Sequence, residues 1–160
     1  MRRNADKPTC MDELRIQSVN EHTQTQAREV ILQGLKEHFG FLDTSLNPDL
    51  NDIMQSYVKQ ENIFLVGLLR DEVVCCGALR TVNDNTGRIV RMSVKQAYRR
   101  NGYASRMIDA LEEIASARGY TKIMLKTMHH WSDAVGFYIS RGYTEDELEG
   151  HSIRMIKSLS

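Results

Sequence analysis

The chain has 160 residues, enough for one domain that buries a sizeable core. Hydrophobic residues make up 41% and charged residues 26%, as in ordinary globular domains, and no apolar run approaches the roughly 20 residues that span a bilayer. Lysine and arginine total 21 and aspartate and glutamate total 21, so the formal net charge is zero. General nucleic-acid binders are usually basic, so the composition argues against that class and against a membrane protein.

The N-terminal segment and the cysteines indicate a simple organisation. Residues 1–12 are polar and lack the apolar core of a signal peptide, so we expect a flexible tail before one domain over residues 13–160. Cys10, Cys75 and Cys76 form neither a C-x-x-C motif nor a metal-ligand set. Cys75 and Cys76 are adjacent in a strand-like run, so they should point to opposite faces of a sheet. These features predict reduced thiols, no metal and a cytoplasmic location.

The first half of the chain predicts a strand, two helices and a hairpin. Residues 14–19 alternate as in a strand, and residues 23–38 carry apolar side chains at helical spacing. Asn47 and Pro48 are typical of an N-cap and first helical position, which predicts a second helix ending near residue 58. Two apolar runs, 63–69 and 73–81, flank a charged turn and predict a hairpin.

The second half alternates strands with helices. The expected elements are a turn at 83–87, a strand at 88–94, a helix at 104–118, a strand at 122–127, a helix at 132–140 and strands at 143–147 and 152–157. Hairpins and a strand–helix–strand crossover occur together, so the fold should be α/β (α+β) with a mixed sheet.

The turn between the strand at 88–94 and the next helix is the strongest functional signal. Arg99 and Arg100 offer charged, forked donors, and Gly102 lets a ligand approach the backbone. Backbone N–H groups at the start of the helix add partial positive charge. The arrangement suits a phosphate, although a basic loop that only caps the helix would have the same pattern. It is neither G-x-G-x-x-G nor a P-loop.

Two motifs together resemble the GNAT superfamily of N-acetyltransferases. Arg99, Gly102 and Ala104 fill the acetyl-CoA-binding pattern [Gln/Arg]-x-x-Gly-x-[Gly/Ala] between a strand and a long helix. The segment AVGFYISRGY, at 134–143, resembles the later A-x-x-F-Y-x-x-x-G-[F/Y] motif of the superfamily. The order of expected elements is also that of the GNAT fold. The resemblance implies a mainly antiparallel sheet of six to seven strands flanked by about four helices, and acetyl-CoA as co-substrate.

The resemblance also implies where coenzyme A binds. Its diphosphate would lie over residues 99–105, and its pantetheine arm would pair with the backbone of the preceding strand, much as an added strand would. Side chains along that strand are equally consistent with core packing, and Ser105 could bind phosphate or cap its helix. The implied cofactor-binding residues are Met92, Ser93, Val94, Arg99, Arg100, Asn101, Gly102, Tyr103, Ala104 and Ser105.

Tyr138 is the candidate catalytic residue. By resemblance it is the tyrosine that often protonates the departing thiolate, and a phenol with a pKa near 10 is protonated at neutral pH. The alternative is an aromatic pair with Phe137 in the core. The general base is open: Arg88 stands where many family members have a glutamate, and the remaining candidates are His129, His130 or a chain of water.

The acceptor site is expected near the first two helices. Arg91 could bind an acceptor carboxylate if it faces the cleft, and His38 lies in a mixed aromatic and polar segment of that region. Trp131 replaces an asparagine that the later motif often carries, so it could shape the acceptor pocket or pack under the helix.

The sequence therefore predicts an acetyl-CoA-dependent N-acetyltransferase without a metal, acting on an amine of a small molecule or peptide by direct attack on the thioester. A non-catalytic acyl-CoA-binding or regulatory module of the same fold is the main alternative, and a general nucleotide-binding domain is a third. A homodimer is a further possibility that the sequence leaves open, and neither nucleic acid nor membrane is expected as a partner.

Overall fold

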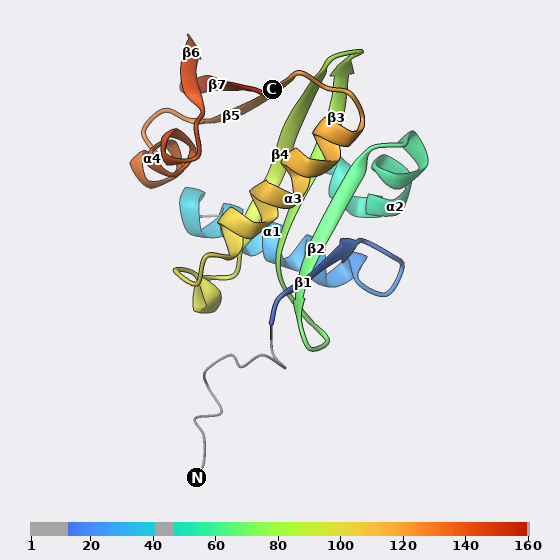
Figure 1. The fold of residues 1–160 in the computed structure, drawn as a ribbon. Helices are drawn as coiled ribbons and strands as arrows, with labels where there is room; N and C mark the ends of the chain where they lie inside the picture. The colour runs from blue at the N-terminus through green and yellow to red at the C-terminus, as the bar shows by residue number, and fades with distance from the viewer. Residues whose placement is uncertain (1–12, 41–46, 160) are drawn as a thin grey trace.

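A single seven-stranded sheet organises the molecule (Figure 1). The computed structural model describes residues 13–40 and 47–159, so the predicted tail at 1–12 lies outside the described residues. The strand order is β1-β2-β3-β4-β5-β7-β6, and every neighbouring pair is antiparallel except β4 and β5. The strands are β1 Arg15–Ser18, β2 Ile63–Leu69, β3 Glu72–Asn83, β4 Thr86–Val94, β5 Lys122–Met128, β6 Thr144–Glu149 and β7 Ser152–Ser158. The predicted mixed, mainly antiparallel sheet is confirmed.

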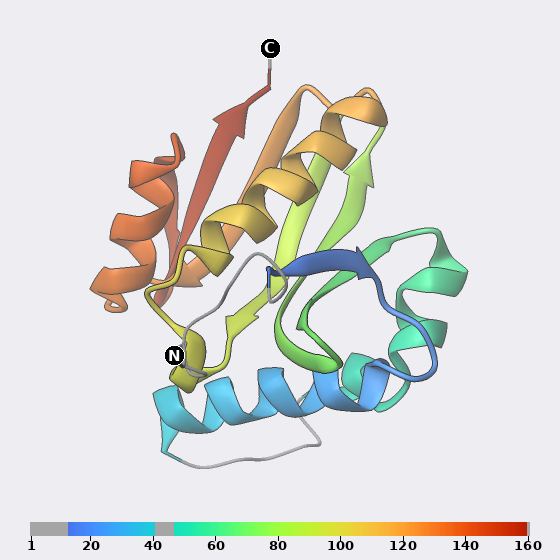
Figure 2. The same cartoon turned by 60° about the horizontal axis from the view of Figure 1, so that its bottom comes forward.

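Helices cover both faces of this sheet (Figures 1 and 2). The α-helices are α1 Gln24–Phe39, α2 Ile53–Ser56, α3 Tyr103–Ala117 and α4 Ser132–Ser140, with short 3-10 helices η3 Pro48–Asp52, η4 Val58–Gln60 and η5 Gln96–Tyr98. None of the described helices is long and apolar enough to cross a membrane. Two apolar clusters result, one beneath α3 and α4 and the other beneath α1 and α2. Cys75 belongs to the first and Cys76 to the second, as the alternation along β3 predicts.

The predicted single helix over 48–58 is wrong. The chain forms η3, α2 and η4 in succession. Asp52 adopts a non-helical backbone conformation, and its side-chain oxygen accepts the N–H of Gln55 at 3.1 Å. This cap restarts the helix in a new direction, which allows Leu50, Ile53 and Tyr57 all to be buried against the sheet. Tertiary burial overrides the continuous helical pattern.

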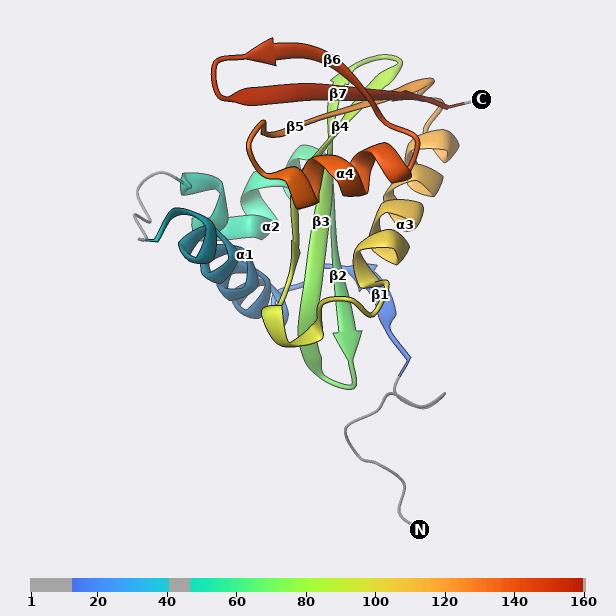
Figure 3. The ribbon, with the colours of Figure 1, turned by 90° about the vertical axis from the view of Figure 1, so that its left-hand side faces the viewer.

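The parallel pair β4–β5 separates soon after it begins. Only Thr86, Gly87 and Arg88 of β4 pair with β5, opposite Lys122, Ile123 and Met124. Both strands continue beyond these residues without pairing to each other. Figure 3 shows the result: β5, β7 and β6 run at a steep angle to β2, β3 and β4. The sheet therefore opens between β4 and β5.

Candidate active site

The opening between β4 and β5 forms a cleft of about 680 Å³. The second half of β4 forms its floor, α1 lines one side, and α4 with the end of β5 lines the other. Four cationic side chains line it, from Arg88, Arg91, Arg99 and Lys126, whereas Asp133 is the one carboxylate among the described lining residues. The cleft thus concentrates positive charge in a chain whose net charge is zero.

The backbone of β4 supplies unpaired polar groups to this cleft. The N–H of Lys95 donates to the carbonyl of Val74 in β3 at 2.8 Å. Because alternate residues of a strand direct their N–H groups to opposite sides, those of Met92 and Val94 face away from β3 and into the cleft. The side chains of these two residues pack partly buried against the core, and the hydroxyl of Ser93 donates to the carbonyl of Val30 at 3.4 Å. An extended amide-containing ligand can therefore pair with the strand itself.

The cleft continues to the N-terminus of α3, which has no side-chain cap and no acidic residue in its first turn. Arg100 and Gly102 both have left-handed backbone conformations, with φ of 68° and 79°. The first intrahelical bond runs from the N–H of Arg106 to the carbonyl of Gly102 at 3.1 Å. The N–H groups of the three residues between them have no intrahelical acceptor. This helix start can bind an anion.

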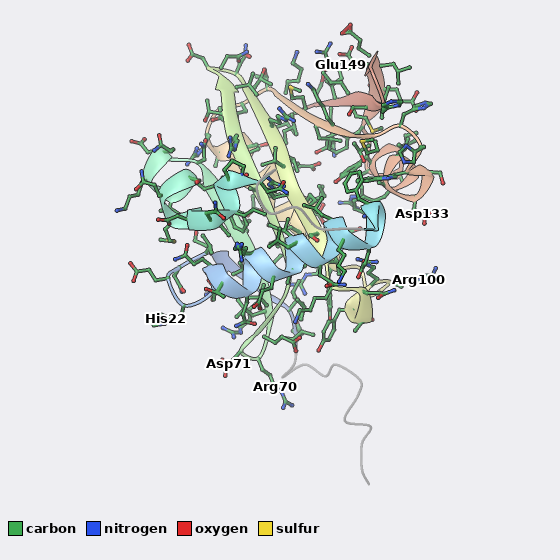
Figure 4. The ribbon with its side chains drawn as sticks, turned by 180° about the vertical axis from the view of Figure 1, so that it is seen from behind. His22, Arg70, Asp71, Arg100, Asp133 and Glu149 are labelled. Atoms are coloured by element: carbon green, nitrogen blue, oxygen red, sulfur yellow. The ribbon has the colours of Figure 1, made fainter. Side chains whose placement is uncertain are left out.

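The side chains around this helix start are fixed in different ways. Arg99 donates to Glu37 of α1 at 2.6 Å and to the carbonyl of Val94 at 3.0 Å, and Asn101 donates to the carbonyl of Tyr98 at 2.9 Å. Arg100 extends into solvent beside α1 (Figure 4). The ring of Tyr103 is buried in the core, Ala104 lines the cleft and Ser105 is half-buried. Arg99 therefore holds the loop against α1, and Arg100 remains available to solution.

Tyr138 lines the cleft from α4. Its ring makes edge contacts with Phe137 and Tyr143, at centroid distances of 5.2 and 5.8 Å. Burial raises the pKa of its hydroxyl to about 12. The phenol is therefore protonated across the whole neutral range and can donate a proton. Tyr138 therefore packs in the core, as one interpretation predicts, and also lines the cleft, as the other predicts.

Aromatic side chains connect the two walls of the cleft. Trp131, at the N-cap of α4, stacks on His38 of α1 with a centroid distance of 4.0 Å, and Phe39 lies 5.6 Å from the same indole. His38 Nδ1 lies 3.0 Å from the carbonyl of Gly34. A carbonyl only accepts, so Nδ1 donates this hydrogen bond and the ring is held against α1. His38 and Trp131, two of the three predicted acceptor residues, both line the cleft.

Arg91 also lines the cleft, from an irregular point of β4. The register between β3 and β4 shifts here, and Arg91 has a φ of 60°, so the bulge redirects its side chain. The guanidinium contacts both carboxylate oxygens of Asp49, at 3.1 and 2.6 Å, and Asn47 Oδ1 at 3.0 Å. Burial alone would raise the pKa of Asp49, but hydrogen bonds from Arg91 and Tyr57 bring it below its ordinary value. This ion pair attaches η3 to the sheet.

Several cleft residues have no prominent signal in the sequence. Lys126 and Ser152 lie on β5 and β7, and Asp133 lies in the first turn of α4 near the end of α1 (Figure 4). Lys126 alternates with the buried Ile123 and Leu125, which indicates its face but not its neighbours. His129 and His130, the two candidate histidines for the general base, are exposed and lie outside the cleft lining. Within residues 13–40 and 47–159, no cluster of three or more metal-ligating side chains occurs.

Comparison with known proteins identifies the fold and the family. The acetyltransferase (GNAT) family model matches residues 28–143, more than half of the chain. The chain belongs to this family. An acetyltransferase of the GNAT family from Staphylococcus aureus superposes with a TM-score of 0.83 at 20% identity, covering 92% of this chain and all of that one. PaiA N-acetyltransferase from Thermoplasma acidophilum, in complex with coenzyme A, gives 0.81 at 14% identity, covering 91% and 99%.

Sequence relatives point to the same GNAT family. N-acetylaspartate synthetase from Xenopus tropicalis is 33% identical over 114 residues, which are 70% of this chain and 42% of that protein. The chain spans about half the length of the curated relatives it matches, several of which are named N-acetyltransferases. This GNAT chain therefore corresponds to only part of those proteins.

Proposed function

We propose that this GNAT chain transfers an acetyl group from acetyl-CoA to an amine of a small molecule or peptide. The carrying observation is that the unpaired edge of β4 leads directly to the uncapped N-terminus of α3 within one cleft. An amide-containing arm and a diphosphate, two parts of coenzyme A, each have a matching partner there.

The diphosphate lies over residues 99–105 in this proposal. The free N–H groups of the first helical turn bind its oxygens, and Arg100 adds charge from solution. The pantetheine arm pairs with the backbone of Met92 and Val94, so the thioester is directed toward the point where β4 and β5 separate. The bound arm takes the place of a neighbouring strand. Its amides form hydrogen bonds with backbone groups of β4 that would otherwise bond to water.

The reaction is a direct displacement. The neutral amine nitrogen attacks the thioester carbon, a tetrahedral intermediate forms, and the C–S bond breaks as it collapses. Tyr138 donates its proton to the departing sulfur and regains one from solvent. The amine loses its own proton to water, since both predicted histidines lie outside the cleft lining.

Thiol release from acetyl-CoA in the presence of an amine panel tests this function. The panel should contain amino acids, because one relative is named N-acetylaspartate synthetase, together with small amines and peptides. We expect one thiol released per acetylated amine, and stronger thermal stabilisation by coenzyme A than by ATP. Stronger stabilisation by ATP would contradict the cofactor assignment.

A non-catalytic acyl-CoA-binding module is the second candidate. Arg88 in place of the glutamate favours it, as does the Trp131–His38 stack between the walls of the cleft. Coenzyme A binding without thiol release for any amine of the panel would support the module over the enzyme.

A further inference from the structure

Arg88 is located where the cleft ends between β4 and β5. It pairs with Met124 in the last register position that joins the two strands, and it lines the cleft. In the β3–β4 pair it lies directly opposite Arg80 of β3. The Arg80 guanidinium covers the ring of Tyr57 on the side of the sheet that α1 and α2 cover. Residues directly opposite each other share a face, so Arg88 projects to that same side. Tyr138 lies on the other side, in the cluster beneath α3 and α4.

This placement separates two roles in the proposed reaction. A thioester held at the end of the cleft would have the proton donor Tyr138 on one side of the sheet. The opposite side, where Arg88 projects, is then the side from which an acceptor can approach. Groups near Arg88 therefore contact the acceptor and not the coenzyme.

Arg88 is the cation of the cleft that lacks a partner among the described residues. Within residues 13–40 and 47–159, its buried Nε atom has no hydrogen-bond partner and its guanidinium is in none of the salt bridges. The other three cleft cations each have a carboxylate partner: Arg91 with Asp49, Arg99 with Glu37 and Lys126 with Glu149. A buried, charged donor without an acceptor is costly, so an anionic ligand would be favoured there.

Glu149, a carboxylate whose charge acts on Arg88, is already paired with two other cations. Glu149, at the end of the β6–β7 hairpin (Figure 4), contacts Lys126 at 2.8 Å and Arg154 at 3.1 Å. Its pKa is lowered chiefly by the hydrogen bond with Lys126, and Arg88 contributes only through its charge at a distance. Glu149 therefore stays ionised but does not reach Arg88. A carboxylate on the acceptor would pair with the guanidinium of Arg88.

We propose that the acceptor amine carries a carboxylate, which Arg88 binds beside Lys126. This inference rests on the proposed acetyl transfer and adds the chemical class of the acceptor. The carboxylate takes no part in bond making: it forms charge-assisted hydrogen bonds with the guanidinium and orients the amine toward the thioester. Arg88, which replaces the glutamate of other family members, thus serves the acceptor.

The test compares acceptors that differ only in charge. Acetylation of aspartate against its diamide, and of glutamate against its diamide, should show at least a 10-fold higher kcat/KM for the carboxylated member of each pair. Arg88→Gln should bring that ratio near one through a higher KM, Arg88→Lys should restore part of it, and coenzyme A affinity should not change. Lys122→Gln, an exposed charge removal at the far end of β5, should leave the ratio intact. Ratios near one in the unaltered protein, or ratios that Arg88→Gln leaves unchanged, would overturn the proposal.

A binding measurement separates this inference from the proposed function. Succinate, a dicarboxylate without an amine, should bind the coenzyme A complex in calorimetry, and neutral succinamide should not. Loss of succinate binding in Arg88→Gln supports the carboxylate site even if no amine is acetylated, in which case the enzyme function alone fails. Absence of succinate binding together with acetylation of uncharged amines overturns the site and leaves the enzyme function standing.

Discussion

Tyr138 shows how the burial that packs a side chain also sets its acidity. Edge contacts with Phe137 and Tyr143 fix its ring, and the same burial raises the pKa of the phenol to about 12. Because a raised pKa keeps the proton on the oxygen, the group remains a donor far above neutral pH. A packing role and a proton-donor role at this position are thus both compatible with a buried tyrosine.

Replacing Tyr138 by phenylalanine should lower kcat by about 100-fold, since positioned proton transfer contributes at least that much. Coenzyme A affinity, measured by calorimetry, should not change. Tyr143→Phe is the matched control: its hydroxyl donates to Glu112 at 2.8 Å, so the variant should lose stability but keep its turnover. Unchanged kcat in Tyr138→Phe would remove the catalytic role.

The pH profile gives a second check at the same residue. The rate should rise with pH as the acceptor amine loses its proton, and it should not fall again up to about pH 10.5, because Tyr138 still holds its proton there. A decline in kcat with a midpoint near pH 8 would identify a different acid.

Some residues of the candidate site could be recognised from the sequence, and others could not. The arginines, the glycine and the Phe137-Tyr138 pair are local signals and could be read directly from the sequence. Arg91 could not be placed in the same way, because its direction depends on a bulge in which an ordinary residue adopts a φ of 60°. Its bond to Asp49, 42 residues away, exists only in the folded chain.

At the scale of elements, the separation of β5 from β4 determines the cleft. Strand and helix positions followed from periodicity, and α4 and β2 lie where the sequence predicts. The separation of β4 from β5 depends on how many residues pair, which periodicity does not contain. Gly77 in β3 contributes to the packing beneath β4, since a Cβ there would approach Met92 Sδ to 2.6 Å and atoms of Leu111 and Met107 to 3.0 Å.

Gly77→Ala should therefore destabilise the protein by about 1–3 kcal/mol through overpacking, measured by urea denaturation. Since Met92 lines the cleft, the displacement should also weaken coenzyme A binding. Gly136→Ala is the control within α4, where a Cβ meets nothing within 4 Å. It should instead stabilise by about 0.5–1 kcal/mol, because alanine favours the helix. Equal effects of the two variants would contradict the packing described for β3.

At the scale of the whole molecule, charge and burial are distributed unevenly. The chain is neutral, yet cations gather in the cleft while thiols and phenols are buried in the two cores. The predicted cytoplasmic location, the homodimer and the domain limits at 13 and 160 stay predictions. Overall composition argued against a nucleic-acid binder, but only the folded cleft shows where positive charge collects.

Buried thiols make the fold sensitive to alkaline pH. Burial raises the pKa of Cys75 to about 12 and also raises that of Cys76. Above the unfolded thiol pKa of about 8.5, the unfolded chain releases protons that the folded chain retains, so stability falls as pH rises. The loss approaches about 1.4 kcal/mol per pH unit for each thiol. Urea midpoints should drop between pH 8 and 10.5, and less so in Cys75→Ala. Constant midpoints would contradict the burial of these thiols.

The binding of coenzyme A in the cleft between β4 and β5 is the claim on which both functional proposals depend. A crystal structure of the complex tests it most directly. We predict diphosphate oxygens within hydrogen-bond distance of backbone N–H groups at residues 101–105, and pantetheine amides paired with Met92 and Val94. A diphosphate bound away from residues 99–105 would contradict the account.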